Sequence, residues 1–219
     1  MKTILCAHGQ FDDVYLYFSN LLKRDMVIKE LPTSQVTYSE IADADIFVLM
    51  PTNNNKLNIK SKEDAHLSNK LKNIQRFVNE GGGVLLLSSA VNNEDENSQI
   101  NQLGRLFDLF FDNHFSDCSQ KVSVIKPSTK HEIAEGVNTF SYPHGCAVQT
   151  NRLSFELKLF DEFVDSHGKE KKRLPILVAF KCGKGKVVGI GSHFIFDSWH
   201  IDDFDNRRLI TNIVEWLSM

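Results

Sequence analysis

The sequence has little of several features that would assign a function class directly. Its 219 residues include five prolines and four cysteines, and the cysteines form no CxxC pair: Cys6, Cys118, Cys146 and Cys182. This spacing excludes a zinc ribbon or a dithiol redox motif. No stretch approaches the roughly 20 apolar residues of a membrane-spanning helix, and the N-terminal apolar run is too short for a secretory signal. We therefore expect a cytoplasmic protein with four reduced thiols and no direct membrane insertion.

A strong excess of charge of either sign is also absent. The formal net charge is −3, so no overall cationic field would attract nucleic acid or an acidic membrane. We expect a protein partner or a small neutral ligand instead, and no nucleic acid; the oligomeric state stays open. With 42% hydrophobic residues, the chain can bury one substantial core. A single domain over residues 1–219 is the expected organisation.

Apolar periodicity predicts an α/β fold. Short continuous apolar runs, typical of buried parallel strands, predict strands at 3–7, 27–31, 46–50 and 84–87. Apolar residues at helical spacing predict helices at 14–22, 71–78 and 100–110. The last third predicts a hairpin with a glycine-rich turn at 175–192 and a capped helix at 202–217. The middle is less regular, with a strand at 121–126 and turns with short strands over 140–160.

Five motifs, taken in order, resemble the GIFT domains. They are HGQ (8–10), EGGGVLLLSS (80–89), HEIAEGV (131–137), YPHGCAVQ (142–149) and GKGKVVGIGSHFIFDSWHIDDFDNRRLITNIVEWL (183–217). These domains are a branch of the class I glutamine amidotransferase-like superfamily, found in gliding-motility ABC-transporter accessory proteins and an intraflagellar transport subunit. The resemblance implies a flavodoxin-like, three-layer α/β/α sandwich with a mostly parallel central sheet. Ligands would then meet loops at the carboxyl ends of the strands.

The resemblance also directs attention to the residues after the 84–87 strand. Active class I amidotransferases place a cysteine there between glycines and pair it with a downstream His and Glu in an HxE arrangement. Here Ser88 and Ser89 follow the strand without flanking glycines, and Phe194 and Ile195 follow His193. A strained nucleophile elbow needs small residues on both sides of the nucleophile. We therefore predict a non-catalytic domain without cofactor.

Two catalytic alternatives stay open, and both describe a degenerate hydrolase. In the first, His193 takes the proton of Ser89, and Asp197 is the nearest residue that could orient the imidazole. In the second, the Cys146 thiol is the nucleophile and His144, two residues away, is its base. A free cysteine is more often a small buried apolar residue.

A cluster of acids near the C-terminus has two interpretations. His200, Asp202, Asp203 and Asp205 lie within six positions and resemble an oxygen-rich cation site. Aspartates also gather before helices because their carboxylates cap free N–H groups and oppose the positive end of the helix dipole. We favour capping and predict no metal.

Polar residues are expected at the carboxyl edge of the sheet, and they are rich in hydroxyls and amides. The predicted ligand-binding set is His8, Gln10, Thr52, Asn53, Ser88, Ser89, Asn92 and His193, with Ser192 beside it. Such a set favours a neutral ligand, a sugar or a peptide, because phosphates usually require Arg or Lys. The alternative is a protein-interaction role, with Phe110, Phe111 and Phe115 as an apolar contact surface.

Overall fold

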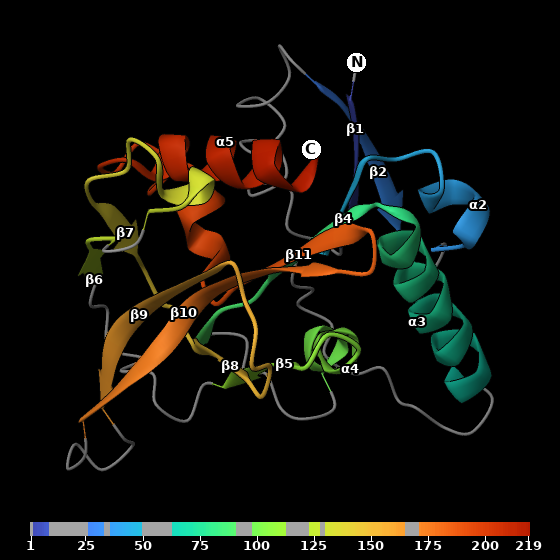
Figure 1. Cartoon of the computed structure of the whole chain (residues 1–219), viewed down its shortest axis with the longest axis horizontal. Helices are drawn as coiled ribbons and strands as arrows, with labels where there is room; N and C mark the ends of the chain where they lie inside the picture. The colour runs from blue at the N-terminus through green and yellow to red at the C-terminus, as the bar shows by residue number, and fades with distance from the viewer. Residues whose placement is uncertain are drawn as a thin grey trace.

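The computed structural model describes most of the chain (Figure 1). The described residues are 2–8, 26–32, 36–49, 63–90, 98–112, 123–127, 130–164 and 171–219. The predicted helix at 14–22 and the charged segment 165–170 lie outside them. None of the described helices is long and apolar enough to cross a membrane.

Within the described residues, seven strands form one central sheet. They are β1 (Lys2–His8), β2 (Met26–Pro32), β3 (Ile46–Leu49), β4 (Gly83–Leu87), β9 (Leu157–Val164), β10 (Lys171–Cys182) and β11 (Gly185–Ile190). The order is β2-β1-β3-β4-β11-β10-β9; the first five strands pair in parallel, and β10 is antiparallel to both β11 and β9. The parallel part has the strand order of flavodoxin-like sheets, with β11 as the fifth strand.

Helices and two small strand pairs surround this sheet. The helices are α2 (Tyr38–Ile41), α3 (Glu63–Glu80), α4 (Gln99–Arg105) and α5 (Asn206–Leu217), with short 3-10 helices η3 (Glu132–Ala134) and η4 (His193–Phe196). The strand pairs are β5 (Leu109–Asp112) with β8 (Ala147–Thr150), and β6 (Ser123–Ile125) with β7 (Phe140–Tyr142). In Figure 1, α5 lies on one side of β4 and β11, and α4 with the β5–β8 pair lies on the other.

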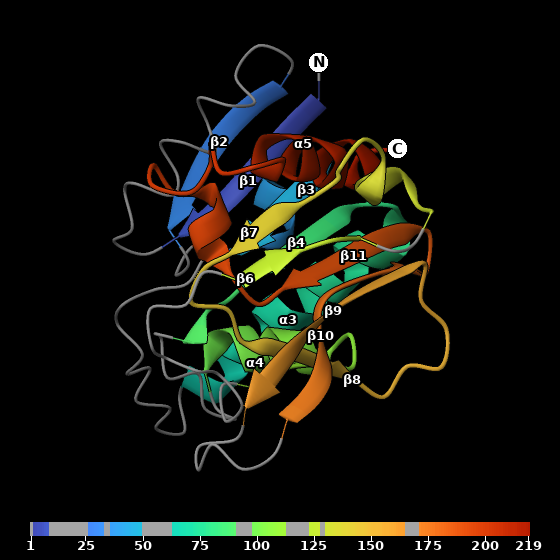
Figure 2. The same cartoon turned by 90° about the vertical axis from the view of Figure 1, so that its left-hand side faces the viewer.

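The core consists of two apolar clusters because the central strands are buried on both faces. In β3, Ile46 and Val48 belong to the cluster that contains α5, whereas Phe47 and Leu49 belong to the cluster that contains α3 and α4. Successive side chains of a strand point to opposite faces, which explains why this strand is apolar at every position. Figure 2, turned by 90°, shows β6 and β7 near α5, and α3 and α4 together.

The predicted α/β fold with a mostly parallel central sheet is confirmed, with one error in the elements. The helix predicted over 100–110 ends at Arg105, and residues 109–112 are a strand. Asp108 has a left-handed backbone conformation (φ 56°), which cannot continue a helix, and the chain enters β5 at the next residue. The predicted hairpin is present, and Gly183 (φ 59°) occupies its turn.

Two buried asparagines attach the small strand pairs to the helices. Asn101 of α4 accepts a hydrogen bond from Phe111 N (2.7 Å) and donates one to Phe111 O (3.1 Å). Asn206 of α5 accepts from Ser141 N (3.0 Å) and donates to Ser141 Oγ (2.7 Å). Each amide satisfies backbone or hydroxyl groups that would otherwise be buried without partners.

We predict that Asn101→Ala and Asn206→Ala each lower the free energy of unfolding by about 2 kcal/mol, since buried polar groups lose their partners. Urea unfolding followed by circular dichroism measures the change. Asn151→Ala is the matched control, because Asn151 is exposed, and it should shift stability by less than about 0.5 kcal/mol. Wild-type midpoints in both core variants would contradict the assigned role of these amides.

Candidate functional site

The structure describes only part of the predicted ligand-binding set. The side chains of Ser88, Ser89, Ser192 and His193 are described, and all are buried. His8 ends β1, but its side chain is not among those described. The remaining members lie outside the described residues: Gln10, Thr52, Asn53 and Asn92.

The segments that follow β4 and β11 come together as parallel neighbours should. Ser88 N donates a hydrogen bond to Ile190 O (3.1 Å), and His193 N donates to Ser88 O (2.7 Å). The His193 Nδ1 atom lies 3.3 Å from the same carbonyl oxygen. The carboxyl end of the sheet therefore brings Ser88 and His193 into contact through backbone groups.

Burial keeps His193 uncharged. Its side chain is 1% exposed, and its ring stacks on Phe194 with ring centroids 4.2 Å apart. Desolvation lowers the pKa of His193 to about 4, although the Ser88 carbonyl favours the protonated form; nearby His144 lowers the pKa further. The imidazole is neutral at pH 7.

A turn over residues 142–146 is attached to the same end of the sheet. Tyr142 Oη lies within hydrogen-bond distance of Cys146 O (2.7 Å) and of Ile176 O (3.3 Å). Cys146 N donates to Gly191 O (2.8 Å), and Gly191 N donates to Ile176 O (3.0 Å). These bonds connect the turn to the middle of β10, at Ile176, and to the end of β11.

The close approach of this turn requires a glycine at position 191. A Cβ atom there would lie 2.0 Å from Cys146 O and 2.3 Å from Tyr142 Oη, closer than any real contact. Within the turn, His144 has a left-handed backbone (φ 47°), which histidine adopts more often than most residues. The carbonyl of His144 accepts a hydrogen bond from Ala90 N (2.8 Å).

The Ala90 hydrogen bond bears on the possible Ser89 nucleophile. In nucleophile elbows, the N–H of the residue after the nucleophile contributes to the oxyanion hole. Here that N–H is the one bound to His144 O. Ser89 Oγ is buried and makes no hydrogen bond in the structure as far as it is described, and the same holds for Ser88 Oγ.

Asp197, the residue nearest to His193 that could orient it, serves other groups. Its Oδ1 accepts hydrogen bonds from Trp199 N (2.9 Å) and His200 N (2.9 Å). The same oxygen lies 3.0 Å from His200 Nδ1. Asp197 therefore organises the turn after η4, in which Trp199 is 82% exposed.

The predicted side-chain capping of α5 is wrong for Asp205, its N-cap residue. The Asp205 carboxylate makes no cap hydrogen bond and instead accepts from Asn138 N (2.8 Å) and Thr139 N (3.1 Å). Asp202 pairs with Arg207. The carboxylates of Asp205 and Asp202 therefore bind different parts of the chain, the 138–139 backbone and Arg207. The described part of the chain contains no cluster of three or more metal-ligating side chains.

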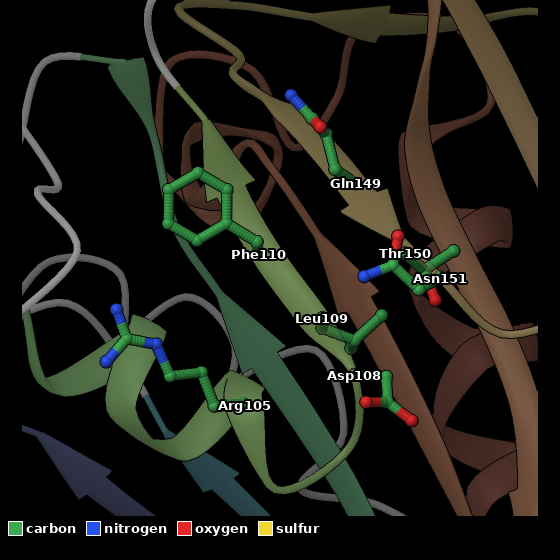
Figure 3. Close-up of a pocket in the computed structure, with 7 residues that line it drawn as sticks. All are labelled: Arg105, Asp108, Leu109, Phe110, Gln149, Thr150 and Asn151. Carbon is green, nitrogen blue, oxygen red and sulfur yellow. The ribbon is translucent and has the colours of Figure 1, made fainter.

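A pocket of about 310 Å³ lies beside the β5–β8 pair, at residues that the sequence analysis did not assign to a binding site (Figure 3). Its walls include Arg105, Asp108, Phe110, Gln149, Thr150 and Asn151. The predicted helix over 100–110 could not reveal this pocket, because the turn at Asp108 and the start of β5 form part of its wall. The only signal in the sequence was Phe110, considered as a contact residue.

No family profile and no curated protein matches the sequence. Solved structures share its fold. The N-terminal domain of mmIFT52 superposes with a TM-score of 0.68 at 14% identity, over 100% of this chain and 98% of that one. A ThuA-like protein from Bacteroides uniformis gives 0.62 at 13% identity (99% and 91%), and a cytoplasmic protein from Salmonella typhimurium gives 0.61 at 14% (99% and 99%). Identities this low establish a common fold alone, and it agrees with the fold that the GIFT resemblance implies.

We predict that His193 makes stability depend on pH between about 6.5 and 4. An unfolded histidine has a pKa near 6.5, whereas the folded value is about 4. The unfolded state therefore binds more protons than the folded state in this window. The contribution of His193 to the free energy of unfolding is complete above pH 6.5 and falls by up to about 3 kcal/mol as the pH drops through the window. Urea unfolding at pH 7, 5.5 and 4.5 should give a flatter profile for His193→Gln. Asn151→Ala, which removes no titratable group, should keep the wild-type slope; equal slopes in all three proteins would contradict the assignment.

Proposed function

We propose that the chain is a non-catalytic, amidotransferase-like domain that binds a neutral ligand or a protein partner. The observation that carries this proposal is the hydrogen bond from Ala90 N to His144 O (2.8 Å). It occupies the donor that would stabilise an oxyanion formed at Ser89. An acyl-transfer site without this donor lacks one of the largest contributions to rate.

The group that would orient the base of a serine site is also engaged elsewhere. A serine needs a base that takes its proton and a third group that orients the base. His193 Nδ1 faces the Ser88 carbonyl, and the Asp197 carboxylate binds the turn at His200. This arrangement supports a structural role for His193.

The thiol alternative meets a similar obstacle. Cys146 is buried, and its N–H is bound to Gly191 O. The His144 ring packs edge-on against Phe194, with centroids 5.0 Å apart. A thiolate needs an electropositive, partly exposed environment to react, and the surroundings of Cys146 do not provide one. A degenerate hydrolase remains the runner-up function.

We predict that the purified protein releases no ammonia from glutamine and hydrolyses no activated ester above the blank, because the Ala90 N–H and the Asp197 carboxylate are engaged elsewhere. Ester turnover that disappears in both Ser89→Ala and His193→Ala, with the fold preserved, would establish the serine alternative instead. Glutaminase activity lost in Cys146→Ala would establish the thiol alternative.

Ligand binding at the carboxyl edge of the sheet is part of this proposal. We place His8, Gln10, Thr52, Asn53 and Asn92 around Ser88, Ser89 and His193, since all of them follow sheet strands in the sequence. The buried hydroxyls of Ser88 and Ser89 support the proposal, because a polar ligand reaching them would satisfy groups that make no hydrogen bond within the described residues.

A protein partner is the second candidate, and exposed aromatics favour it. Trp199 is 82% exposed and Phe204, five positions later, is 60% exposed. Phe204 also has a left-handed backbone (φ 48°), which is costly for a bulky residue and persists only where the surrounding structure enforces it. Tryptophan and phenylalanine are enriched in the centres of protein interfaces.

We also propose that residues 1–219 form one three-layer α/β/α domain in the cytoplasm. The two core clusters on opposite faces of the sheet support the layers. The similar protein from Salmonella typhimurium is described as cytoplasmic, which supports the compartment. Cys6, Cys146 and Cys182, the cysteines described, form no disulfide.

The compartment proposal predicts about four titratable thiols per chain. Ellman's reagent under denaturing, non-reducing conditions measures this number. Without denaturant, Cys6 and Cys146 should react slowly because they are fully buried, and burial also raises the pKa of the Cys6 thiol. A denatured count near two would show a disulfide and contradict the proposal.

A further inference from the structure

The β5–β8 pair has one face in the core and one face on the pocket. Leu109, Phe111 and Val148 belong to the buried cluster that includes α4. Phe110 and Gln149 are direct partners across the two strands, and both line the pocket. In Figure 3, the Phe110 ring and the Arg105 side chain lie on one side, and Gln149, Thr150 and Asn151 lie along the neighbouring strand.

The pocket wall is held in place by the core. The Asn101 amide bonds both backbone groups of Phe111, the residue after Phe110. A Cβ atom at Gly104 would lie 2.7 Å from Leu109 O, so α4 and β5 approach each other closely. Because the strand that carries Phe110 is fixed, a ligand binding there needs little ordering of the protein.

Hydrogen bonds within the wall also orient its polar groups. Gln149 Nε2 donates to Asp112 Oδ2, which leaves the Gln149 Oε1 atom as an acceptor. Thr150 Oγ1 accepts from Arg152 N (3.1 Å), so its O–H remains a donor. These internal bonds set which atoms the wall can offer to a ligand.

The wall therefore presents donors and acceptors together. The donors are the Arg105 guanidinium, the Thr150 hydroxyl and the Asn151 amide nitrogen; the acceptors are the Asp108 carboxylate and the Gln149 and Asn151 amide oxygens. A phosphate or carboxylate needs donors only, and an ammonium needs acceptors only. A ligand hydroxyl donates and accepts at once, so it matches a mixed wall. The wall carries one positive group, Arg105, and one negative group, Asp108, whose Oδ2 atom also lies 3.8 Å from Arg152 Nη1. A wall without an excess of either charge favours a neutral ligand.

Phe110 adds an apolar surface to this set. Its side chain is half-buried and lies in the wall among the polar groups. The C–H face of a sugar ring can pack on such a ring while the hydroxyls at its rim bind polar side chains. The volume of about 310 Å³ lies at the lower end of small-molecule sites, which span roughly 300–1,000 Å³.

We propose that this pocket binds a neutral carbohydrate of monosaccharide size, with the sugar ring on Phe110 and its hydroxyls on Asp108, Gln149 and Asn151. The proposal rests on the proposed binding function and places a ligand site away from Ser88, Ser89 and His193. It concerns binding alone, so it does not depend on whether those three residues react.

Saturation-transfer difference NMR on the full chain tests the proposal, with methyl glycosides of glucose, galactose and mannose as probes. At least one probe should receive saturation, mainly at the protons of one ring face. Phe110→Ala and Gln149→Ala should each weaken the binding of that probe at least tenfold. Glucuronic acid and glucosamine, charged analogues of the same size, should bind more weakly than the neutral sugar.

Phe155→Ala is the matched control, because Phe155 is an exposed phenylalanine outside the pocket wall, and it should keep wild-type binding. No transfer to any neutral probe would overturn the proposal, as would binding unchanged in both Phe110→Ala and Gln149→Ala. Failure here is separable from failure of the proposed function, because the ammonia and ester assays report on Ser89, His193 and Cys146. A protein that turned over ester and still bound sugar would contradict only the non-catalytic proposal.

Discussion

The meeting of three chain segments at Gly191 is the constraint on which the candidate site depends. The end of β11, the middle of β10 and the 142–146 turn meet there, and a Cβ atom at Gly191 would lie 2.0 Å from the Cys146 carbonyl oxygen. Tyr142, whose pKa burial raises well above its usual value, remains an uncharged hydroxyl beside two of these carbonyls. The same turn carries the His144 carbonyl, which accepts a hydrogen bond from Ala90 N, so that backbone groups bind one another directly after β4.

The polar side chains described directly after β4 and β11 are uncharged. His193 is neutral, and the hydroxyls of Ser88 and Ser89 are fully buried. Acids and arginines instead occupy the surface before α5, where Asp202 pairs with Arg207. A buried, uncharged polar edge supplies hydrogen bonds without a strong field, which stabilises a neutral ligand or a fixed conformation better than a developing ionic transition state.

The sequence predicted the central strands well and the peripheral elements poorly, for physical reasons. A strand buried on both faces, such as β3, is apolar at every position, and the turn at Gly183 requires a left-handed residue. By contrast, β5 forms because it pairs with β8 and because the Asn101 amide binds the backbone of Phe111. Neither contact can be predicted from the sequence of β5 itself. The proximity of Ser88 and His193 followed from parallel strands. The hydrogen bond from Ala90 N to His144 O could not be predicted in this way, because it depends on an irregular turn far away in the sequence.

The central position of β11 also determines when the sheet can be completed during synthesis. Strand β4 pairs with β3 on one edge and with β11 on the other, and β11 begins at residue 185. Until the ribosome has released that segment, the second edge of β4 presents unpaired backbone N–H and C=O groups between apolar side chains, which is a template for wrong pairing with other chains. Closing a connection of this length is slow relative to local folding. The edge of β4 therefore stays open to wrong pairing for longer than in a protein whose neighbouring strands follow one another directly.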